Sequence, residues 1–353
     1  MRRSVIPAIF VLASVPAFGA GFHALSLPGS QLGVLSADGR SGAGGLVGGA
    51  SGGFRWNEGE TPELLTGAMS IRAISASGRY VAGSSLDASQ REVATWWDAD
   101  GIAHSLGGLP GADARAGVLS VAYGITDQPR LVGSAVNAER ASTAFVWAAG
   151  DGMHALVSTG IASGASGVSS DGRRIFGWSE DADATRRGVL WNQGRMCCSV
   201  ETGATSNDLA GANRGATLLL GFVRDAGDSE RPFRWIPDAN SSRTPIANAP
   251  ALGPMRFTAS SDDGSVLVGA AGSGAQRIAV VWTERGGVER LDAFIAEQGI
   301  AVPAGWVLCA ATAVSADARR IAGFGLKDGR FDSFVIDLPR STADAAVRTS
   351  TAP

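Results

Sequence analysis

A short pattern that recurs at intervals of 35 to 54 residues limits the fold of this chain more than any other feature. The pattern is an apolar pair followed by glycine, and it occurs at Leu46-Val47-Gly48, Val81-Ala82-Gly83, Leu131-Val132-Gly133, Ile175-Phe176-Gly177, Leu219-Leu220-Gly221, Leu267-Val268-Gly269 and Ile321-Ala322-Gly323. Recurrence with a period of this size is typical of solenoids, propellers and other repeat architectures.

A second marker has the same period. An apolar triplet that ends in a large residue follows each glycine, at Phe54-Arg55-Trp56, Ala94-Thr95-Trp96, Phe145-Val146-Trp147, Val189-Leu190-Trp191, Phe233-Arg234-Trp235, Val280-Val281-Trp282 and Phe334-Val335-Ile336. Six of the nine tryptophans occupy this position. Two markers with one period predict seven repeats. We interpret the tryptophans as core residues between neighbouring units, and not as stacking platforms for carbohydrate.

Most repeats begin with a turn of the form Ser-x-Asp-Gly-Arg. Examples are Ser36–Arg40 and Ser169–Arg173, and Ser315–Arg319 has the same form with Ala318 in place of glycine, whereas the third and fifth repeats have the degenerate turns Thr126–Pro129 and Ala212–Gly215. Asp-Gly between apolar runs is a strong hairpin signal, because glycine tolerates positive φ and aspartate bonds the nearby backbone. Four short strands per repeat, with almost no helical periodicity, predict an all-β, seven-bladed β-propeller with four-stranded blades.

The two ends of the propeller are predicted to meet. The last repeat stops after its third strand, Ser333–Leu338, while Phe22–Gly29 is similar to the fourth-strand sequence His104–Gly111. We therefore expect the N-terminal strand to complete the last blade and remove an exposed edge. The first strands, rich in Gly, Ala, Ser and Val, are expected to line an axis too crowded for bulky side chains. A short helix is expected within Val288–Gly299.

The N-terminus predicts export. Two arginines, an apolar stretch and small residues make residues 1–20 a predicted signal peptide, followed by the propeller at 21–340 and a disordered tail at 341–353. We expect a secreted bacterial protein, periplasmic or extracellular, monomeric and without an integral membrane segment after cleavage. The charged fraction of 18% and the net charge of −3 argue against a nucleic-acid binder.

The sequence resembles the HAF-repeat family of predicted extracellular bacterial proteins. The resemblance rests on the recurring turn, glycine and tryptophan elements, on Leu106–Gly111, and on the stretch from Leu291 to Pro339. It implies secretion and a repeat fold, and it implies no established activity and no catalytic residues.

No catalytic constellation is evident in the sequence. The three histidines, His23, His104 and His154, fall in predicted fourth strands far from the axis, so no shared metal site is expected. Tyr123 falls in a first strand near the channel, and we interpret it as a packing residue. No nucleophile elbow, phosphate loop or zinc motif occurs. We expect no cofactor and no metal.

Other polar groups have ordinary interpretations. Asp181 and Asp183 alternate like calcium ligands but lack the remaining ligands, so we interpret them as a solvated loop. Cys197 and Cys198 are placed in an outer strand of the fourth blade and Cys309 in an inner strand of the seventh, which predicts that Cys309 is unpaired.

Arginines enter most third strands, on one predicted face. They are Arg91, Arg140, Arg187, Arg231, Arg277 and Arg330. A ring of these residues could bind an anionic polymer. The alternative is a salt-paired rim, because Glu92, Glu139, Asp183 and Glu230 lie beside several of them.

Two functions follow from this pattern. The first is a secreted binding module for an unknown extracellular or cell-surface glycan or protein. The second is a carbohydrate-active enzyme, either a polysaccharide lyase or a glycoside hydrolase. An enzyme should have an axial funnel with clustered carboxylates, arginine or tyrosine, whereas a binding module should have small or mixed residues there. The composition of the first strands favours the binding module.

Overall fold

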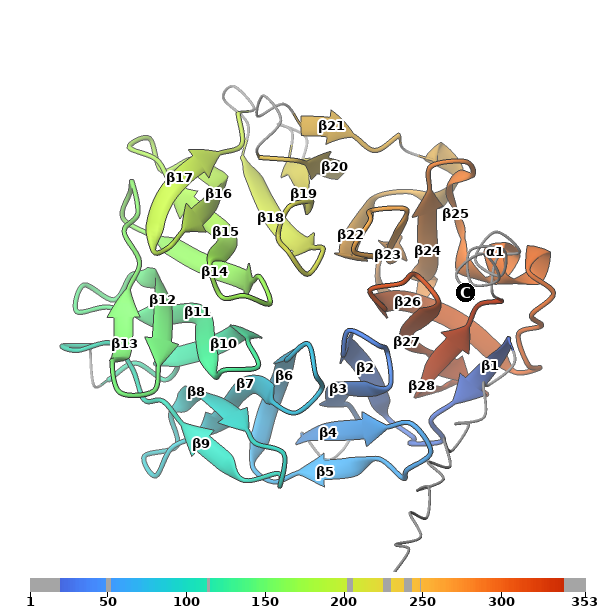
Figure 1. Ribbon diagram of the computed structural model, residues 1–353, viewed down its shortest axis with the longest axis horizontal. Coiled ribbons are helices and arrows are strands. Elements are labelled where there is room, and N and C mark those ends of the chain that lie inside the picture. The colour runs from blue at the N-terminus through green and yellow to red at the C-terminus, as the bar shows by residue number, and fades with distance from the viewer. Residues whose placement is uncertain are drawn as a thin grey trace, which may run out of the picture.

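The computed structural model describes residues 20–48, 52–112, 115–201, 206–224, 230–237, 243–247 and 249–339. In these residues, antiparallel sheets radiate from a central axis like the blades of a propeller (Figure 1). The predicted signal peptide, except Ala20, and the predicted C-terminal tail lie outside the described residues. Within the described part, no helix has the length and apolar content needed to cross a membrane.

Five sheets have four strands each. In the order from the axis outward, they contain β2 (Ser30–Leu35), β3 (Ser41–Leu46), β4 (Gly52–Asn57) and β5 (Glu63–Leu65); β6 (Ala68–Ile74), β7 (Val81–Leu86), β8 (Glu92–Trp97) and β9 (Ala103–Ser105); β10 (Ser120–Ile125), β11 (Arg130–Val136), β12 (Ser142–Ala148) and β13 (Gly152–Ala155); β14 (Ser163–Val168), β15 (Arg174–Glu180), β16 (Arg186–Asn192) and β17 (Arg195–Ser199); and β26 (Trp306–Val314), β27 (Arg320–Lys327), β28 (Arg330–Asp337) and β1 (Gly21–Ala24).

A further sheet has eight strands. One half contains β18 (Asn207–Ala212), β19 (Leu219–Arg224), β20 (Glu230–Trp235) and β21 (Arg243–Pro245), and the other contains β22 (Met255–Ser260), β23 (Val266–Ala271), β24 (Ile278–Thr283) and β25 (Gly287–Arg290). Only one parallel pair, Ala212 with Ala259, joins the inner strands β18 and β22. The prediction of seven blades treats each half as a separate blade. The hydrogen-bond pattern groups the two halves in one sheet.

The N-terminal strand completes the last sheet, as predicted. Strand β1 pairs antiparallel with β28, with Phe22 opposite Ile336, so the start and the finish of the propeller lie side by side (Figure 1). The ring of Phe22 also lies 5.5 Å from that of Phe334. Helix α1 (Leu291–Glu297) forms within the predicted helical segment and buries Leu291 and Ile295. Two short 3-10 helices, η1 (Pro250–Leu252) and η2 (Gly274–Gln276), flank strands β22 and β24.

The recurring glycine is explained by a bulge in each inner strand. The glycines of the second strands are Gly44, Gly83, Gly133, Gly177, Gly221, Gly269 and Gly323, and a Cβ on any of them would overlap an inner-strand carbonyl oxygen. The inner strand shifts register immediately after the residue opposite each glycine. The marker predicted for the first repeat was wrong, because Gly44 occupies this position and Gly48 has open space around it.

The recurring tryptophan needs one similar correction. Trp97, not Trp96, is opposite Val81, as Trp147 is opposite Leu131, so Trp97 holds the repeat position in the second repeat. Trp97, Trp191 and Trp235 are fully buried, whereas the equivalent Trp56, Trp147 and Trp282 are partly buried. Trp96 instead stacks on His104, with ring centres 4.2 Å apart.

The Ser-x-Asp-Gly turns form hydrogen bonds both internally and with one another. In the fourth repeat, Ser169 Oγ donates to Asp171 Oδ1 at 2.6 Å, and the backbone N–H of Arg173 donates to the same oxygen. Backbone N–H groups also donate from one turn to the next around the axis: Ala316 to Ala37, Ala37 to Ala76, Ser170 to Arg214 and Asp262 to Ala316. We call this set the hairpin belt.

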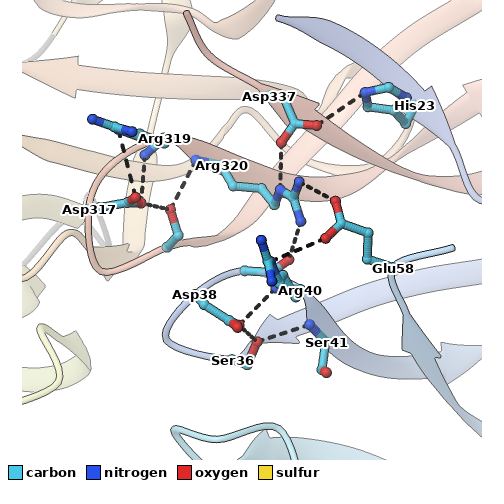
Figure 2. A network of polar contacts seen from close by, with 12 residues as sticks. His23, Ser36, Asp38, Arg40, Ser41, Glu58, Asp317, Arg319, Arg320 and Asp337 are labelled. Atoms are coloured by element: carbon cyan, nitrogen blue, oxygen red, sulfur yellow. Dashed lines mark hydrogen bonds and ion pairs between the residues drawn. The ribbon is translucent and has the colours of Figure 1, made fainter. Parts of the chain in front are cut away.

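A polar network joins the last sheet to the first (Figure 2). Arg320 on β27 donates to Asp337 Oδ1 at 2.5 Å, to Glu58 Oε1 at 2.7 Å and to the Gly39 carbonyl at 3.1 Å. His23 Nε2 on β1 lies 3.2 Å from Asp337 Oδ2. The side chains of this network therefore link the same two ends of the chain that the β1–β28 pairing links.

Candidate functional site

A cavity of about 1350 Å³ lies on the axis and is lined by the inner strands. The seven residues left unpaired by the bulges all line it: Gly33, Arg72, Tyr123, Ser166, Ala210, Thr258 and Thr312. Five of them are small, in keeping with the prediction for the first strands. The expectation that bulky side chains do not fit was wrong, because the bulge turns Arg72 and Tyr123 into an open cavity.

One end of this cavity holds a group of charged and aromatic side chains. It contains Trp178 on β15, Arg186 on β16, Asp208 on β18, Phe222 on β19, Glu230 on β20 and Arg256 on β22, which all line the cavity, together with Arg224 on β19, which is outside the lining and binds Glu230. Asp208 and Arg256 precede the bulge residues Ala210 and Thr258 by two positions, which places them on the same side of their strands and away from the hairpin belt. We call these seven residues the arginine–aromatic cluster.

Each of two arginines in the cluster lies on an aromatic ring and binds a carboxylate. The Cζ of Arg186 is 3.7 Å from the centre of the Trp178 ring, and its Nη1 donates to Asp208 Oδ2 at 3.3 Å. The Cζ of Arg256 is 4.2 Å from the centre of the Phe222 ring, and its guanidinium binds Glu230 through two nitrogens. Such stacking holds a guanidinium plane in place while its remaining N–H groups stay available.

The two carboxylates differ in electrostatic environment. Burial raises the pKa of Asp208 above its usual value, although Arg186 acts in the opposite direction. The hydrogen bond from Arg256 lowers the pKa of Glu230, and a further bond from Arg224, at 3.1 Å, adds to this effect. Three arginines thus face two carboxylates, whose pKa values are displaced in opposite directions.

Two more arginines line the cavity outside the cluster. The Cζ of Arg72 lies 5.8 Å from the centre of the Tyr123 ring, and that of Arg277 lies 5.7 Å from the centre of the Phe324 ring. Among the described residues, neither has a salt bridge to a carboxylate. The lining therefore carries an excess of positive charge.

Arg214 lies at the opposite end of the cavity. From the hairpin after β18 it extends to the hairpin after β2, where its Nη2 donates to the Ser36 carbonyl at 2.7 Å and to the Leu35 carbonyl at 3.3 Å. Burial lowers its pKa. The hairpin belt and the Arg214 side chain therefore obstruct this end.

The six predicted rim arginines do not gather in one site. Only Arg277 lines the cavity. Arg91 pairs with Asp87 at 2.8 Å and Arg187 with Asp181 at 3.1 Å, so each of these two forms a salt bridge. Arg140, Arg231 and Arg330 lie outside the lining of this cavity. Glu230, predicted beside Arg231, binds Arg224 and Arg256 of the cluster.

The histidines and cysteines lie where the repeats place them. His23, His104 and His154 are on the outermost strands β1, β9 and β13. The described part of the chain contains no group of three potential metal ligands. The three cysteines are free, with Cys309 buried on β26 and the sulfur atoms of Cys197 and Cys198 3.0 Å apart on β17. Asp181 accepts backbone hydrogen bonds within its own loop.

Sequence reasoning missed the arginine–aromatic cluster. Two of its members could have been noticed in the sequence. Asp208 and Arg256 are charged residues in inner strands, where the other repeats have mostly small or apolar residues. Trp178, Arg186 and Phe222 carried no such signal, since second and third strands contain such residues in many proteins. Only the tertiary arrangement shows that these strands direct their side chains to one end of the axis.

Comparisons with known proteins support the fold. No protein-family model and no curated protein sequence matches the chain. Among solved structures it is similar to an oligogalacturonate lyase in complex with manganese, with a TM-score of 0.60 and 14% identity over 91% of this chain and 93% of that chain. It is also similar to the β-propeller domain of Myceliophteria thermophila Cps50, with a TM-score of 0.56 and 13% identity over 90% and 99% of the two chains.

A third similar structure is the β-propeller domain of the Trilobed protease from Pyrococcus furiosus, with a TM-score of 0.55 and 8% identity over 87% and 95% of the chains. That domain is described as having an open velcro topology, whereas β1 closes the ring here. Identities this low indicate shared architecture alone. The chain is a β-propeller.

Proposed function

We propose that this protein is a secreted binding module that holds an anionic ligand in its axial cavity. The observation that carries the proposal is the set of guanidinium groups held against aromatic rings around the cavity: Arg186 on Trp178, Arg256 on Phe222 and Arg72 beside Tyr123. Guanidinium pairs with carboxylate or phosphate through two parallel hydrogen bonds, and stacking reduces the entropy lost when it does so. Secretion and membership of the HAF-repeat family are part of this proposal.

The charge balance favours an anion. Asp208 and Glu230 offset two positive charges at most, whereas Arg72, Arg186, Arg256 and Arg277 all line the cavity. The side chains of Arg186, Arg224 and Arg256 are 41%, 44% and 49% exposed, so a ligand can reach their free N–H groups. Of the rim arginines predicted from the sequence to bind an anion, this proposal keeps Arg277, because it lines the cavity.

Calorimetric titration tests the proposal with three anions of different chemistry: citrate, inorganic triphosphate and trigalacturonate. We expect at least one to bind, and we expect the double variant Arg186→Gln/Arg256→Gln to lose about tenfold or more in affinity, as each charge-assisted hydrogen bond contributes roughly 1.5–3 kcal/mol. Arg173→Gln is the matched control, because its side chain is 71% exposed on a hairpin. The proposal fails if none of these anions binds, or if the double variant, shown to be folded by its melting curve, binds like the unmodified protein.

The second candidate is a carbohydrate-active enzyme acting in the same cavity. One observation favours it: Asp208 and Glu230 lie in one cluster with pKa values displaced in opposite directions, as a general acid and a base require. Prolonged incubation with oligogalacturonate, followed by chromatography for shortened or unsaturated products, distinguishes the two. A product whose formation stops in Asp208→Asn would favour the enzyme.

A further inference from the structure

We infer that the ligand is an acidic saccharide and that the end of its chain enters the cavity past the arginine–aromatic cluster. This inference rests on the proposed anion site and makes it specific in two respects, the chemistry of the ligand and the direction of entry.

The direction follows from the difference between the two ends of the cavity. At the hairpin end, the turns are joined by backbone hydrogen bonds of 2.8 to 3.0 Å, and Arg214 extends between hairpins on different blades. A chain could pass this end only if Arg214 gave up its two carbonyl partners. At the other end, the side chains of Arg186 and Arg256, which line the cavity, are 41% and 49% exposed and present free N–H groups to solvent. The cavity thus has one accessible entrance and takes a chain end, not the middle of a threaded polymer.

The size of the cavity indicates an extended ligand. Its volume of about 1350 Å³ exceeds the range of roughly 300–1000 Å³ that is common for small-molecule sites. A single carboxylate or phosphate ion would leave most of it filled with water. An oligomer of several rings would reach from the cluster to the ring of bulge residues.

The lining of the deeper part favours a hydroxyl-rich ligand. The hydroxyl groups of Tyr123, Ser166 and Thr258 belong to bulge residues that line the cavity, and none has a hydrogen bond within the described residues. The bulge residues Gly33 and Ala210 have no large side chain and leave this part of the cavity open. Hydroxyl groups without protein partners, arginines and the apolar and aromatic surfaces beside them suit a chain of sugar rings, which have apolar faces, hydroxyl groups and acidic groups, and this is the chemistry of a uronate oligosaccharide.

Titration with galacturonate oligomers of increasing length tests the direction of entry. We expect affinity to rise from the monomer to short oligomers and then level off, with one protein bound per chain for a hexamer and for long polygalacturonate alike. Binding to the interior of a chain would instead give several proteins per long polymer, and that result would overturn single-ended entry.

The chemistry of the ligand is tested by comparison and by variants. Trigalacturonate should bind about tenfold or more tightly than citrate or triphosphate, and neutral trigalactose should bind weakly. The double variant Ser166→Ala/Thr258→Ala should weaken trigalacturonate binding by about thirtyfold, at roughly 1 kcal/mol for each of the two hydrogen bonds, and leave triphosphate binding unchanged. Ser105→Ala, exposed on the outer strand β9, is the control.

The failures are distinguishable. If citrate or triphosphate binds as tightly as the saccharide, or if the hydroxyl variant has no effect, the saccharide inference is wrong while the anion site stands. If no anion binds, the proposed function itself fails.

Discussion

Replacing Arg320 by methionine should weaken the closure of the propeller. Its guanidinium is the centre of the network in Figure 2, where it binds Asp337 on β28, Glu58 after β4 and the carbonyl of Gly39. The side chain of Arg320 is only 11% exposed, and those of Asp337 and Glu58 are 12% and 19% exposed. Methionine preserves much of the apolar stem but leaves two buried carboxylates without this cation.

The expected loss follows from the burial of the partners. Removing one member of a buried ion pair costs roughly 3–5 kcal/mol, because the other charge remains uncompensated. Arg40, 3.4 Å from Glu58, offsets part of this cost. We therefore expect a decrease of about 3 kcal/mol in the free energy of unfolding, a large fraction of the roughly 5–15 kcal/mol typical of folded domains.

Urea denaturation followed by tryptophan fluorescence measures this change. Arg173→Met is the control, because Arg173 lies 4.0 Å from Asp171 in an exposed pair and its loss should change stability by less than about 0.5 kcal/mol. If the unfolding free energies of the two variants differ by less than about 1 kcal/mol, the reasoning that Arg320 holds the ring closed is wrong.

Three further changes test other parts of the structure. Gly177→Ala would drive a Cβ into the Gly164 carbonyl and should destabilise the protein by about 3 kcal/mol or more in thermal melting, whereas Gly117→Ala, with open space around it, should be nearly neutral. Trp97→Ala should cost roughly 3–5 kcal/mol, because the ring is fully buried and its Nε1 donates to the Thr66 carbonyl, and a smaller loss than that of Trp96→Ala would contradict the corrected repeat alignment. Burial raises the pKa of Asp208, which faces Arg186, Arg224 and Arg256, so on acidification it should take up a proton at a higher pH than an ordinary aspartate, and anion binding should tighten a few-fold as it does so. Asp208→Asn should bind more tightly at pH 7 and lose most of that dependence, and an equally steep pH profile in calorimetric titrations of both proteins would exclude Asp208 as its cause.

The sequence was sufficient to predict the propeller because its repeats are imposed by local geometry. A glycine is required wherever a bulged inner strand brings its carbonyl against the second strand, and a Ser-x-Asp-Gly turn satisfies its own backbone groups wherever two short strands reverse. Both requirements act within one blade, so the same residues recur in the sequence of most blades. Pairing of Gly21–Ala24 with β28 was predictable for the same reason, since the last repeat lacked a fourth strand.

The repeat alignment failed where a local pattern had two possible readings. In the first repeat Gly48 follows the apolar pair Leu46-Val47, whereas Gly44 follows the small pair Gly42-Ala43, and in the second repeat Trp96 and Trp97 are adjacent. Alternate residues of a strand face opposite sides, so a shift of one position exchanges a buried side chain for one on the other face. Only the register with the neighbouring strand shows which residue occupies the repeat position.

The amino-acid sequence by itself thus determined the secondary structure, the repeat unit and the closure of the ring, because these depend on contacts inside one blade or between chain ends with complementary strands. The tertiary structure alone decided the arginine–aromatic cluster, the cavity and the obstruction by Arg214. Arg186, Asp208 and Arg256 come from three successive parts of the chain, and Arg214 binds residues 178 and 179 positions away. Such neighbours are set by how blades pack around the axis, and no local spacing encodes them.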